Sequence, residues 1–343
     1  MREEAAKALC VGIPGQELDD EMARLLADLQ PGGVILLPRN VESEGQLREL
    51  VAAVRRAVPG ALLYLDAEGG RVDRLRSLVG PAPSGAALAA SPPRVARTAG
   101  RWVGAALRCF GFDVDLAPVV DIDHGQADNA LDRRYLGAHP RAVVARAGAF
   151  LDGLHGAGTS GCLKHFPGLG AAGQDTHYEG SVVPLSARRL ERDLAPFARL
   201  GQAAGAIMAS HAAYPALDPE GRPATLSPPI ATGLLRGRLD FRGLLFSDDL
   251  DMKALEPWGD LPERAAASFA AGCDAIFVCW SPQEAPAMAE KLSAPGLAGR
   301  LTEALGRIET WRARVRRLAA AAPVPSLDQV RRGLERVRRA AGE

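Results

Sequence analysis

The 343-residue sequence lacks an excess of either charge, because 41 lysines and arginines balance 41 aspartates and glutamates. A chain without net charge has no overall field to attract nucleic acid or an anionic membrane, so neither is an expected partner. No apolar run is long enough to span a bilayer. The first residues, MREEAAKALCVGIPG, contain acidic side chains and only a short apolar run, which is unlike a secretory signal. We therefore expect a cytoplasmic protein that does not enter the membrane.

The sequence contains few cysteines, and their spacing does not indicate disulfide or metal-binding pairs. The five cysteines are odd in number, lie in apolar surroundings and include no CxxC pair. This distribution predicts buried, reduced thiols in a cytosolic protein and argues against a structural zinc site. They are Cys10, Cys109, Cys162, Cys273 and Cys279.

Eight short apolar runs recur along the chain, and Ala-, Leu- and Arg-rich segments with apolar residues three and four apart lie between them. Eight repeats of strand and helix are typical of a parallel sheet closed into a (β/α)8 TIM-type barrel. A doubly wound open sheet is the alternative, although no GxGxxG opens a helix. The expected strands are 8–13, 33–37, 61–66, 112–118, 161–165, 206–211, 243–248 and 275–279.

A single break in the pattern occurs at AAAPVPS, residues 320–326. We therefore expect one barrel domain, residues 1–320, which carries the site, and a C-terminal helix, residues 321–343, which packs on the barrel. Ser326 and Gln329 have the spacing of a capping box, and apolar residues then recur at three and four. The arginines after Arg331 also fit a nucleic-acid tail, but a solvated helix face is the favoured interpretation.

Charged and imidazole side chains follow several of the predicted strands. The third strand ends in Asp66, the fifth in Lys164 and His165, the sixth in His211, and the seventh in Asp248 and Asp249. In a barrel these strand ends converge on one face, which is where barrel enzymes carry their chemistry. Because a buried charge is costly unless it is paired or serves a ligand, this gathering predicts a shared polar pocket.

Three segments, in this order, resemble one known family: LDAEGGRVDRL, KHFPGLGAAGQDTH and LLFSDDLDM. GGVILLPRN, DLAPVVDID and PATLSP match it as well. The chain is similar, over about residues 8–280, to glycoside hydrolase family 3, and specifically to its bacterial cytoplasmic β-N-acetylglucosaminidase (β-N-acetylhexosaminidase) branch. The combination of segments is specific, although GGR or SDD alone would carry no weight.

The resemblance implies a retaining glycosidase, in which a nucleophile bonds to the anomeric carbon and an acid protonates the leaving oxygen. It assigns the nucleophile to Asp248, and Asp249 is expected to support it. His177 would be the proton donor and acceptor, with Asp175 two residues earlier orienting its ring and raising its pKa. Glycines 168, 170 and 173 would let this loop close over the sugar. The proposed chemistry needs neither a metal nor an organic cofactor.

The resemblance also places five substrate-binding residues: Asp66, Arg74, Arg134, Lys164 and His165. Lys164 and His165 would donate hydrogen bonds to sugar hydroxyls, Asp66 would accept from two of them, and the arginines would meet the N-acetyl group and neighbouring oxygens.

The sequence departs from the family pattern at a few positions. LDRRYLGAHP offers both Arg133 and Arg134, and the glycine that usually precedes this arginine is Asp132 here. Leu169 stands where a polar residue is common, and Ala67 where glutamine is common. The departures at Leu169 and Ala67 bear on the leaving group and leave the residues for bond cleavage in place, whereas the first one bears on which arginine contacts the substrate.

The implied substrate is a small carbohydrate, N-acetylglucosaminyl-anhydro-muropeptide, in the recycling of cell-wall peptidoglycan, and we expect a monomer. Three other functions stay open: a phosphorylase that uses phosphate as the acceptor, a family 3 β-glucosidase, and a non-catalytic sugar-binding barrel. The glucosidase is disfavoured because such enzymes lack the DTH loop and carry a second domain. A dead barrel should have lost Asp248 or His177, and both are present.

Overall fold

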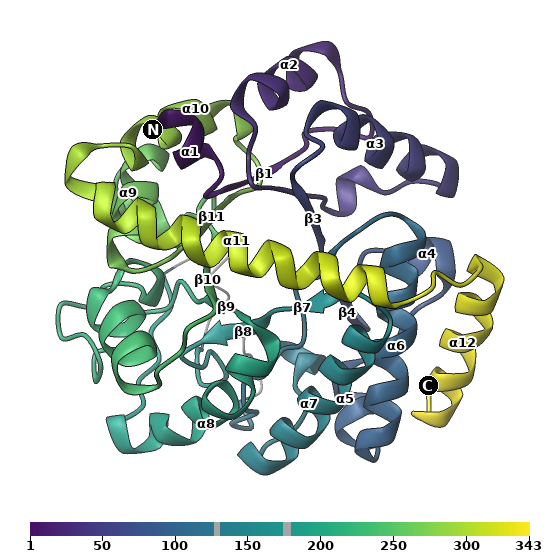
Figure 1. Ribbon diagram of the computed structural model, residues 1–343. Helices are drawn as coiled ribbons and strands as arrows, with labels where there is room; N and C mark the ends of the chain where they lie inside the picture. The colour runs from purple at the N-terminus through teal and green to yellow at the C-terminus, as the bar shows by residue number, and fades with distance from the viewer. Residues whose placement is uncertain (127–130, 174–179) are drawn as a thin grey trace.

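The computed structural model describes residues 1–126, 131–173 and 180–343 (Figure 1). Nine parallel strands form one sheet in the order β7-β6-β3-β2-β1-β11-β10-β9-β8. Their bounds are β1 Leu9–Gly12, β2 Gly33–Ile35, β3 Leu62–Leu65, β6 Val114–Asp115, β7 Ser160–Gly161, β8 Leu163–Phe166, β9 Ala206–Ala209, β10 Leu244–Asp249 and β11 Ala275–Val278.

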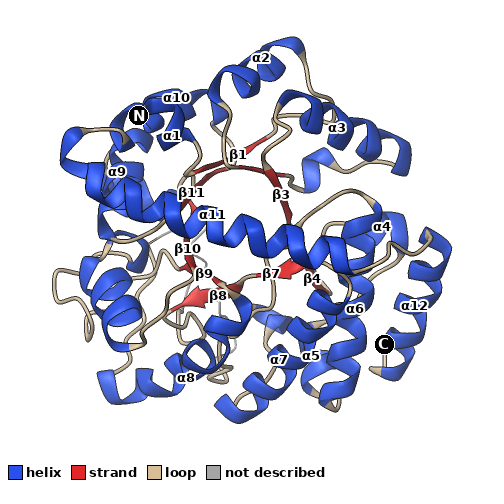
Figure 2. Ribbon diagram, viewed as in Figure 1, coloured by secondary structure: helices blue, strands red, loops and turns tan. Residues whose placement is uncertain are grey.

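The sheet closes into a barrel because β7 and β8 are two pieces of one strand, separated only by Cys162. β7 pairs with β6 on one side and β8 pairs with β9 on the other, and a parallel bridge joins Val119 to Lys164. Each of the eight predicted strands coincides with one barrel strand, so the predicted (β/α)8 barrel with a C-terminal helical tail is confirmed. Figure 2 shows the strands as a central ring with helices around it.

Helices form the outer layer, and most of them connect one barrel strand to the next. The α-helices are α1 Arg2–Ala6, α2 Asp20–Leu29, α3 Glu44–Ala57, α4 Arg76–Val79, α5 Gly85–Ala89, α6 Pro93–Cys109, α7 Pro140–Gly156, α8 Ala187–Ala204, α9 Leu261–Ala271, α10 Ala285–Leu292, α11 Ala298–Ala321 and α12 Leu327–Ala340. The 3-10 segments are η1 Pro38–Asn40, η2 Asp132–Arg134, η3 Ala224–Leu226, η5 Lys253–Trp258, η6 Pro282–Glu284 and η7 Pro295–Leu297, and η4 Pro229–Arg238 is a π-helix.

The long helix α11 crosses one end of the barrel (Figure 1). Its Trp311 is buried and contacts Phe246 edge to face, with ring centres 6.4 Å apart, and Phe246 in turn contacts Tyr64 and Phe277. Arg312 of the same helix binds the carbonyl of Gly60, just before β3. Since these contacts lie at the amino ends of the strands, α11 closes that end and leaves the carboxyl ends for the site.

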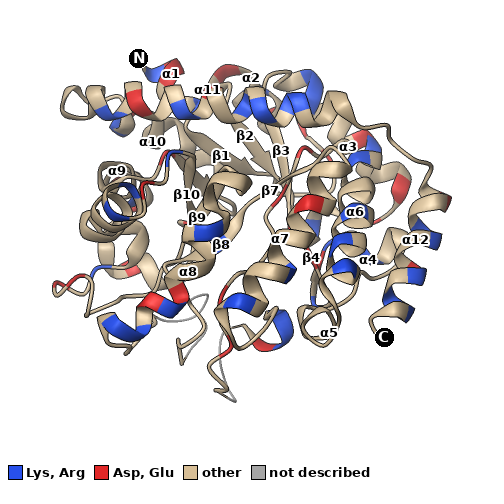
Figure 3. Ribbon diagram, turned by 60° about the horizontal axis from the view of Figure 1, so that its bottom comes forward, with Lys and Arg blue, Asp and Glu red and all other residues tan. Residues whose placement is uncertain are grey.

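The last helix, α12, packs on α6 and α4. The predicted capping box is present, because the Ser326 hydroxyl accepts from the Gln329 N–H and the Gln329 side chain accepts from the Ser326 N–H. Val330, Leu334 and Val337 are buried, whereas the arginines of this helix are mostly half-buried or exposed. Acidic and basic side chains are both spread over the outer helices (Figure 3).

Among the residues that the structure describes, no helix is both long and apolar enough to cross a membrane. A short antiparallel hairpin, β4 Ala67–Gly69 and β5 Val72–Asp73, follows β3 and was not predicted from the sequence. It carries Glu68, which belongs to the site described below.

All five cysteines are free thiols, and four of them are buried.

Candidate active site

The carboxyl ends of β3, β8 and β10 bring the predicted polar residues to one face of the barrel. Asp66 follows β3, Lys164 and His165 belong to β8, and Asp248 belongs to β10. Lys164 and His165 are almost fully buried, at 3% and 5% exposure. Buried charges at strand ends must be compensated, and the structure shows how.

Lys164 is the centre of an ion-pair network. Its Nζ lies 2.7 Å from Oδ1 of Asp66 and 2.6 Å from Oε1 of Glu68. Glu68 in turn accepts two parallel hydrogen bonds from Arg134, both 2.8 Å long. Such a bidentate pair fixes the plane of the guanidinium as well as its position. Two carboxylates and two cations therefore form one ion-paired cluster at the carboxyl ends of the strands.

The pKa values of these groups follow from burial and pairing. Burial alone would raise the pKa of Glu68, but the charges of Arg134 and Lys164 outweigh it and hold that pKa well below its usual range. Burial would likewise lower the pKa of Lys164, yet the charges of Asp66 and Glu68 raise it. Glu68 and Lys164 are thus both ionised at neutral pH.

Glu68, which links Lys164 to Arg134, is not among the site residues predicted from the sequence. A signal was available, because Asp66 and Glu68 are two residues apart in extended chain and side chains at that spacing share a face. The hairpin β4–β5 continues directly from β3, so it presents Glu68 to the same pocket as Asp66. Arg134 comes from η2, in a distant part of the chain.

The structure separates the two neighbouring arginines. Arg134 binds Glu68 and lies 3.5 Å from Nε2 of His165. Arg133 is 68% exposed and lies 3.7 Å from the carboxylate of Glu343 instead. Only Arg134 therefore joins the network with Lys164. Arg74 lies at its edge, with its guanidinium 3.9 Å from Asp66 and its backbone N–H donating to the Asp66 carbonyl.

A third carboxylate, Asp121, positions His165. Nδ1 of His165 lies 2.7 Å from Oδ2 of Asp121, and the backbone N–H of His165 also donates to this carboxylate. The N–H of Leu169 donates to the other oxygen over 2.7 Å. A proton on Nδ1 is therefore held by Asp121, and Nε2 is directed to the Arg134 side of the pocket. Leu169 itself is 4% exposed and packs in the core.

The seventh barrel strand, β10, ends with two adjacent aspartates that differ in their surroundings. Asp248 is partly exposed, and its Oδ1 accepts from the N–H of Asp249 over 2.8 Å. Asp249 accepts from the N–H groups of Cys279 and Asp251, and its carbonyl accepts from Nε2 of the buried His211. Burial, together with the charge of Asp251, raises the pKa of Asp249 to about 7.

His177 and Asp175 lie outside the described residues. The segment that leads to them is tightly held. Gly168 has a φ of +127°, and a side chain on Gly170 would meet the carbonyl oxygen of Ile122 at 1.9 Å. Glycine is therefore required at both positions for close packing, rather than only for freedom of movement.

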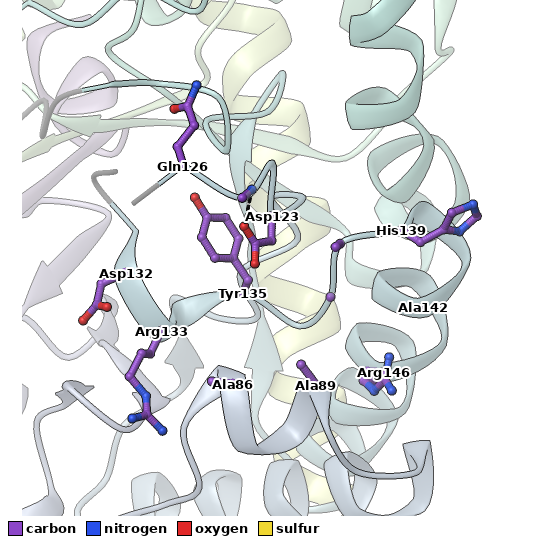
Figure 4. Close-up of a pocket in the computed structure, with 13 residues that line it drawn as sticks. Ala86, Ala89, Asp123, Gln126, Asp132, Arg133, Tyr135, His139, Ala142 and Arg146 are labelled. Carbon is purple, nitrogen blue, oxygen red and sulfur yellow. Dashed lines mark hydrogen bonds between the residues drawn. The ribbon is translucent and has the colours of Figure 1, made fainter. Parts of the chain in front are cut away.

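A cavity of about 680 Å³ opens beside this network, between the loop after β6 and helices α5 and α7 (Figure 4). Tyr135 and Asp123 stand at its centre, and Arg133 lines one side. The cavity is next to the network because Arg133 and Arg134 are consecutive. Its described lining includes none of the predicted site residues; those that the structure describes lie at the strand ends and in the network around Lys164.

Among residues 1–126, 131–173 and 180–343, no group of three or more His, Cys, Asp or Glu side chains has the arrangement of a metal site. The carboxylates of the described pocket contact cations, imidazole and backbone N–H groups instead. Such a set of donors and acceptors can bind the hydroxyls of a sugar. The barrel and this pocket together define an enzyme of the glycoside hydrolase class.

Comparison with known proteins identifies the family. The description "Glycosyl hydrolase family 3 N terminal domain" matches residues 2–318. A protein named Beta-hexosaminidase from Pseudomonas aeruginosa (strain LESB58) is 40% identical over 278 residues, which cover 79% of this chain and 82% of that protein. The chain therefore belongs to glycosyl hydrolase family 3, and the resemblance seen in the sequence, including its β-N-acetylhexosaminidase branch, is confirmed.

Two solved structures support the same conclusion. A family 3 β-N-acetylglucosaminidase from Paenibacillus sp. str. FPU-7 is similar with a TM-score of 0.91 at 29% identity, over 99% of this chain and 68% of that one. NagZ from Neisseria gonorrhoeae, solved in complex with N-trifluoroacetyl-D-glucosamine, has a TM-score of 0.75 at 30% identity, over 92% of this chain and 97% of that one.

Proposed function

We propose that the protein is a retaining exo-β-N-acetylglucosaminidase that releases terminal N-acetylglucosamine through a covalent glycosyl-enzyme intermediate. Its proposed natural substrate is an N-acetylglucosaminyl-anhydro-muropeptide, and we propose that it acts in the cytoplasm as a monomer. The observation that carries the proposal is the buried network of Lys164, Asp66, Glu68 and Arg134 at the strand ends, on the same barrel face as Asp248.

The network suits a terminal sugar. Lys164 and Asp66 present a donor and an acceptor that are already held in place, so little side-chain freedom is lost when hydroxyls bind. Arg134 and His165 lie side by side and can meet the N-acetyl group and the next oxygen. The related structures that were solved as N-acetylglucosaminidases support this choice of sugar.

Asp248 has the setting expected of the nucleophile. Asp66, Glu68 and Asp121 hold the cations and the imidazole of the network in place. Asp248 is partly exposed at the end of a rigid strand, where a carboxylate can attack a bound anomeric carbon.

In the proposed reaction, Asp248 forms a bond to the anomeric carbon while His177 gives a proton to the leaving oxygen. His177 then takes a proton from water, which attacks the same carbon and releases Asp248. Two inversions at one carbon retain the β configuration. Asp175 holds the imidazole of His177 in this scheme.

A panel of aryl β-glycosides tests the sugar specificity. We expect turnover of the N-acetylglucosaminide, weaker turnover of the N-acetylgalactosaminide, and little of the glucoside or xyloside. Proton NMR of the first product should show the β anomer before mutarotation. A preference for the glucoside, or an α product, would refute the proposal.

The choice of acceptor is tested with the same substrate in millimolar phosphate. A neutral imidazole at His177 does not repel phosphate as a carboxylate would. The available cations, however, are committed elsewhere, because Lys164 and Arg134 are both held by Glu68. We therefore expect free sugar as the main product. A larger phosphorus NMR signal from N-acetylglucosamine 1-phosphate would instead identify a phosphorylase.

A further inference from the structure

An exposed tryptophan lies on the same face of the barrel as the pocket. Trp280 lies two residues after the end of β11 and is 63% exposed. The chain has four tryptophans. Trp102 and Trp311, in contrast, pack within the fold. A large exposed aromatic side chain often marks a binding surface.

Trp280 is held in a fixed position. The guanidinium of Arg39 stacks on its ring, 4.0 Å from the ring centre. Arg39 is itself anchored, because Nε donates to the carbonyl of Ile13 over 2.9 Å and Nη2 donates to the carbonyl of Cys279 over 2.5 Å. The backbone N–H of Trp280 donates to Oδ2 of Asp251 over 2.7 Å. One face of the indole is thus supported by a cation, and much of the ring remains open to solvent.

The same hydrogen bonds connect Trp280 to the end of the nucleophile strand. Asp249, the neighbour of Asp248, accepts from the N–H groups of Cys279 and Asp251 through one oxygen, Oδ1. Asp251 then binds the N–H of Trp280. The backbone at Trp280 is therefore fixed relative to β10 by these hydrogen bonds, and the Arg39 guanidinium lies against the indole ring itself.

The exposure of Trp280 decides which part of a substrate it can meet. The sugar that is cleaved off is recognised by nearly buried groups, such as Lys164 at 3% and Glu68 at 9% exposure. A ring at 63% exposure lies at the rim, so it can contact only the portion of the substrate that stays outside the pocket. That portion is the leaving group.

We propose that Trp280, supported by Arg39, is the platform for the leaving-group sugar, and that the apolar face of a second pyranose ring stacks on the open side of the indole. This inference rests on the proposed function, since it assumes a terminal sugar in the pocket. An apolar C–H face on an aromatic ring supplies contact area without requiring a particular pattern of hydroxyls. The site therefore selects a flat sugar ring over a small alkyl group.

The test compares two leaving groups. One substrate is N-acetylglucosamine β-1,4-linked to a second N-acetylhexosamine, and the other is methyl β-N-acetylglucosaminide. Trp280→Ala should lower kcat/KM for the disaccharide by about three- to tenfold, which is the usual worth of one aromatic contact. It should leave the methyl glycoside within twofold of the wild type. Trp280→Phe should recover most of the loss, and Trp280→Leu should recover less.

Trp258→Ala is the matched control, because Trp258 is also a partly exposed tryptophan, in η5 after β10, but has no fixed arginine against its ring among the described contacts. It should affect the two substrates equally.

A separate binding measurement keeps the two proposals distinguishable. Calorimetry with thio-linked versions of both compounds requires no turnover, so it tests the platform even if the wild type hydrolyses neither substrate. Trp280→Ala should weaken binding of the thio-disaccharide alone. Equal losses on both compounds would make Trp280 a structural residue, and no loss on either would show that its exposed face serves something other than the leaving group. Either result would overturn the inference.

Discussion

Replacing Glu68 with glutamine removes the negative charge from the side chain that joins Lys164 to Arg134. The glutamine keeps a carbonyl oxygen but loses the charge, so Arg134 is left without its ionic partner in a site where Glu68 is only 9% exposed. Breaking a buried pair from one side costs about 3–5 kcal/mol, and the retained acceptor should reduce this to about 2–4 kcal/mol. With roughly 2–3 °C per kcal/mol for a large domain, the melting temperature should fall by about 5–10 °C.

The loss should depend on pH with a definite sign. Pairing with Arg134 and Lys164 lowers the pKa of Glu68 in the folded state. The wild type therefore holds the full stabilisation above the pKa of an unfolded glutamate, about 4.3. It loses this stabilisation as pH falls below that value, toward the lower pKa of the folded state. The difference between wild type and Glu68→Gln should be constant from pH 8 to pH 5 and should shrink at lower pH.

Urea unfolding followed by circular dichroism at pH 7, 5 and 3.5 would measure both effects. Glu335→Gln is the matched control, since Glu335 pairs with Arg339 on the solvent side of α12 and its loss should not change the unfolding free energy measurably. Arg134→Gln should cost less in the Glu68→Gln background than in the wild type. The reasoning would be refuted if Glu68→Gln were as stable as the control. It would also be refuted if the difference in unfolding free energy between wild type and Glu68→Gln did not change with pH.

Two further predictions concern the reaction and the nucleophile strand. Asp249→Asn should gain stability relative to the wild type as pH rises from 4 to 8. The pKa of Asp249 is raised to about 7, so the wild type loses stability over the interval between its unfolded and folded pKa values, and asparagine does not; a pH-independent difference in urea unfolding would contradict this. His177→Ala should slow substrates with poor leaving groups by about a hundred- to ten-thousandfold, but activated aryl glycosides far less, because an aryloxide leaves without a proton. Equal losses in kcat/KM on both kinds of substrate would make His177 a binding residue.

The barrel could be predicted because its strands are short, apolar and regularly spaced. All eight runs coincide with strands, since a parallel barrel buries both faces of each strand. The interruption of the fifth strand at Cys162 left no mark in the apolar pattern. The role of α11 as the cover of the amino-terminal end also could not be read from periodicity, because it depends on which barrel end the helix meets.

The site was predictable only as a set of strand-end residues. Asp66, Lys164, His165 and Asp248 stand at the ends of apolar runs, which is a local signal. Glu68 and Arg134 are 66 positions apart, and nothing in either segment shows that they pair. For the same reason, the sequence could not choose between Arg133 and Arg134, which differ only in where the chain turns them.

The central claim is that Asp248 forms the covalent bond to the sugar. The most direct measurement treats the wild type with an activated 2-fluoro sugar and locates the added mass by peptide mass spectrometry. We expect one glycosyl unit on the peptide that holds Asp248, with fragmentation placing it on that residue, and no labelling of Asp248→Ala. A label on Asp249 or Asp66, or a product formed with inverted configuration and no trapped intermediate, would contradict the account.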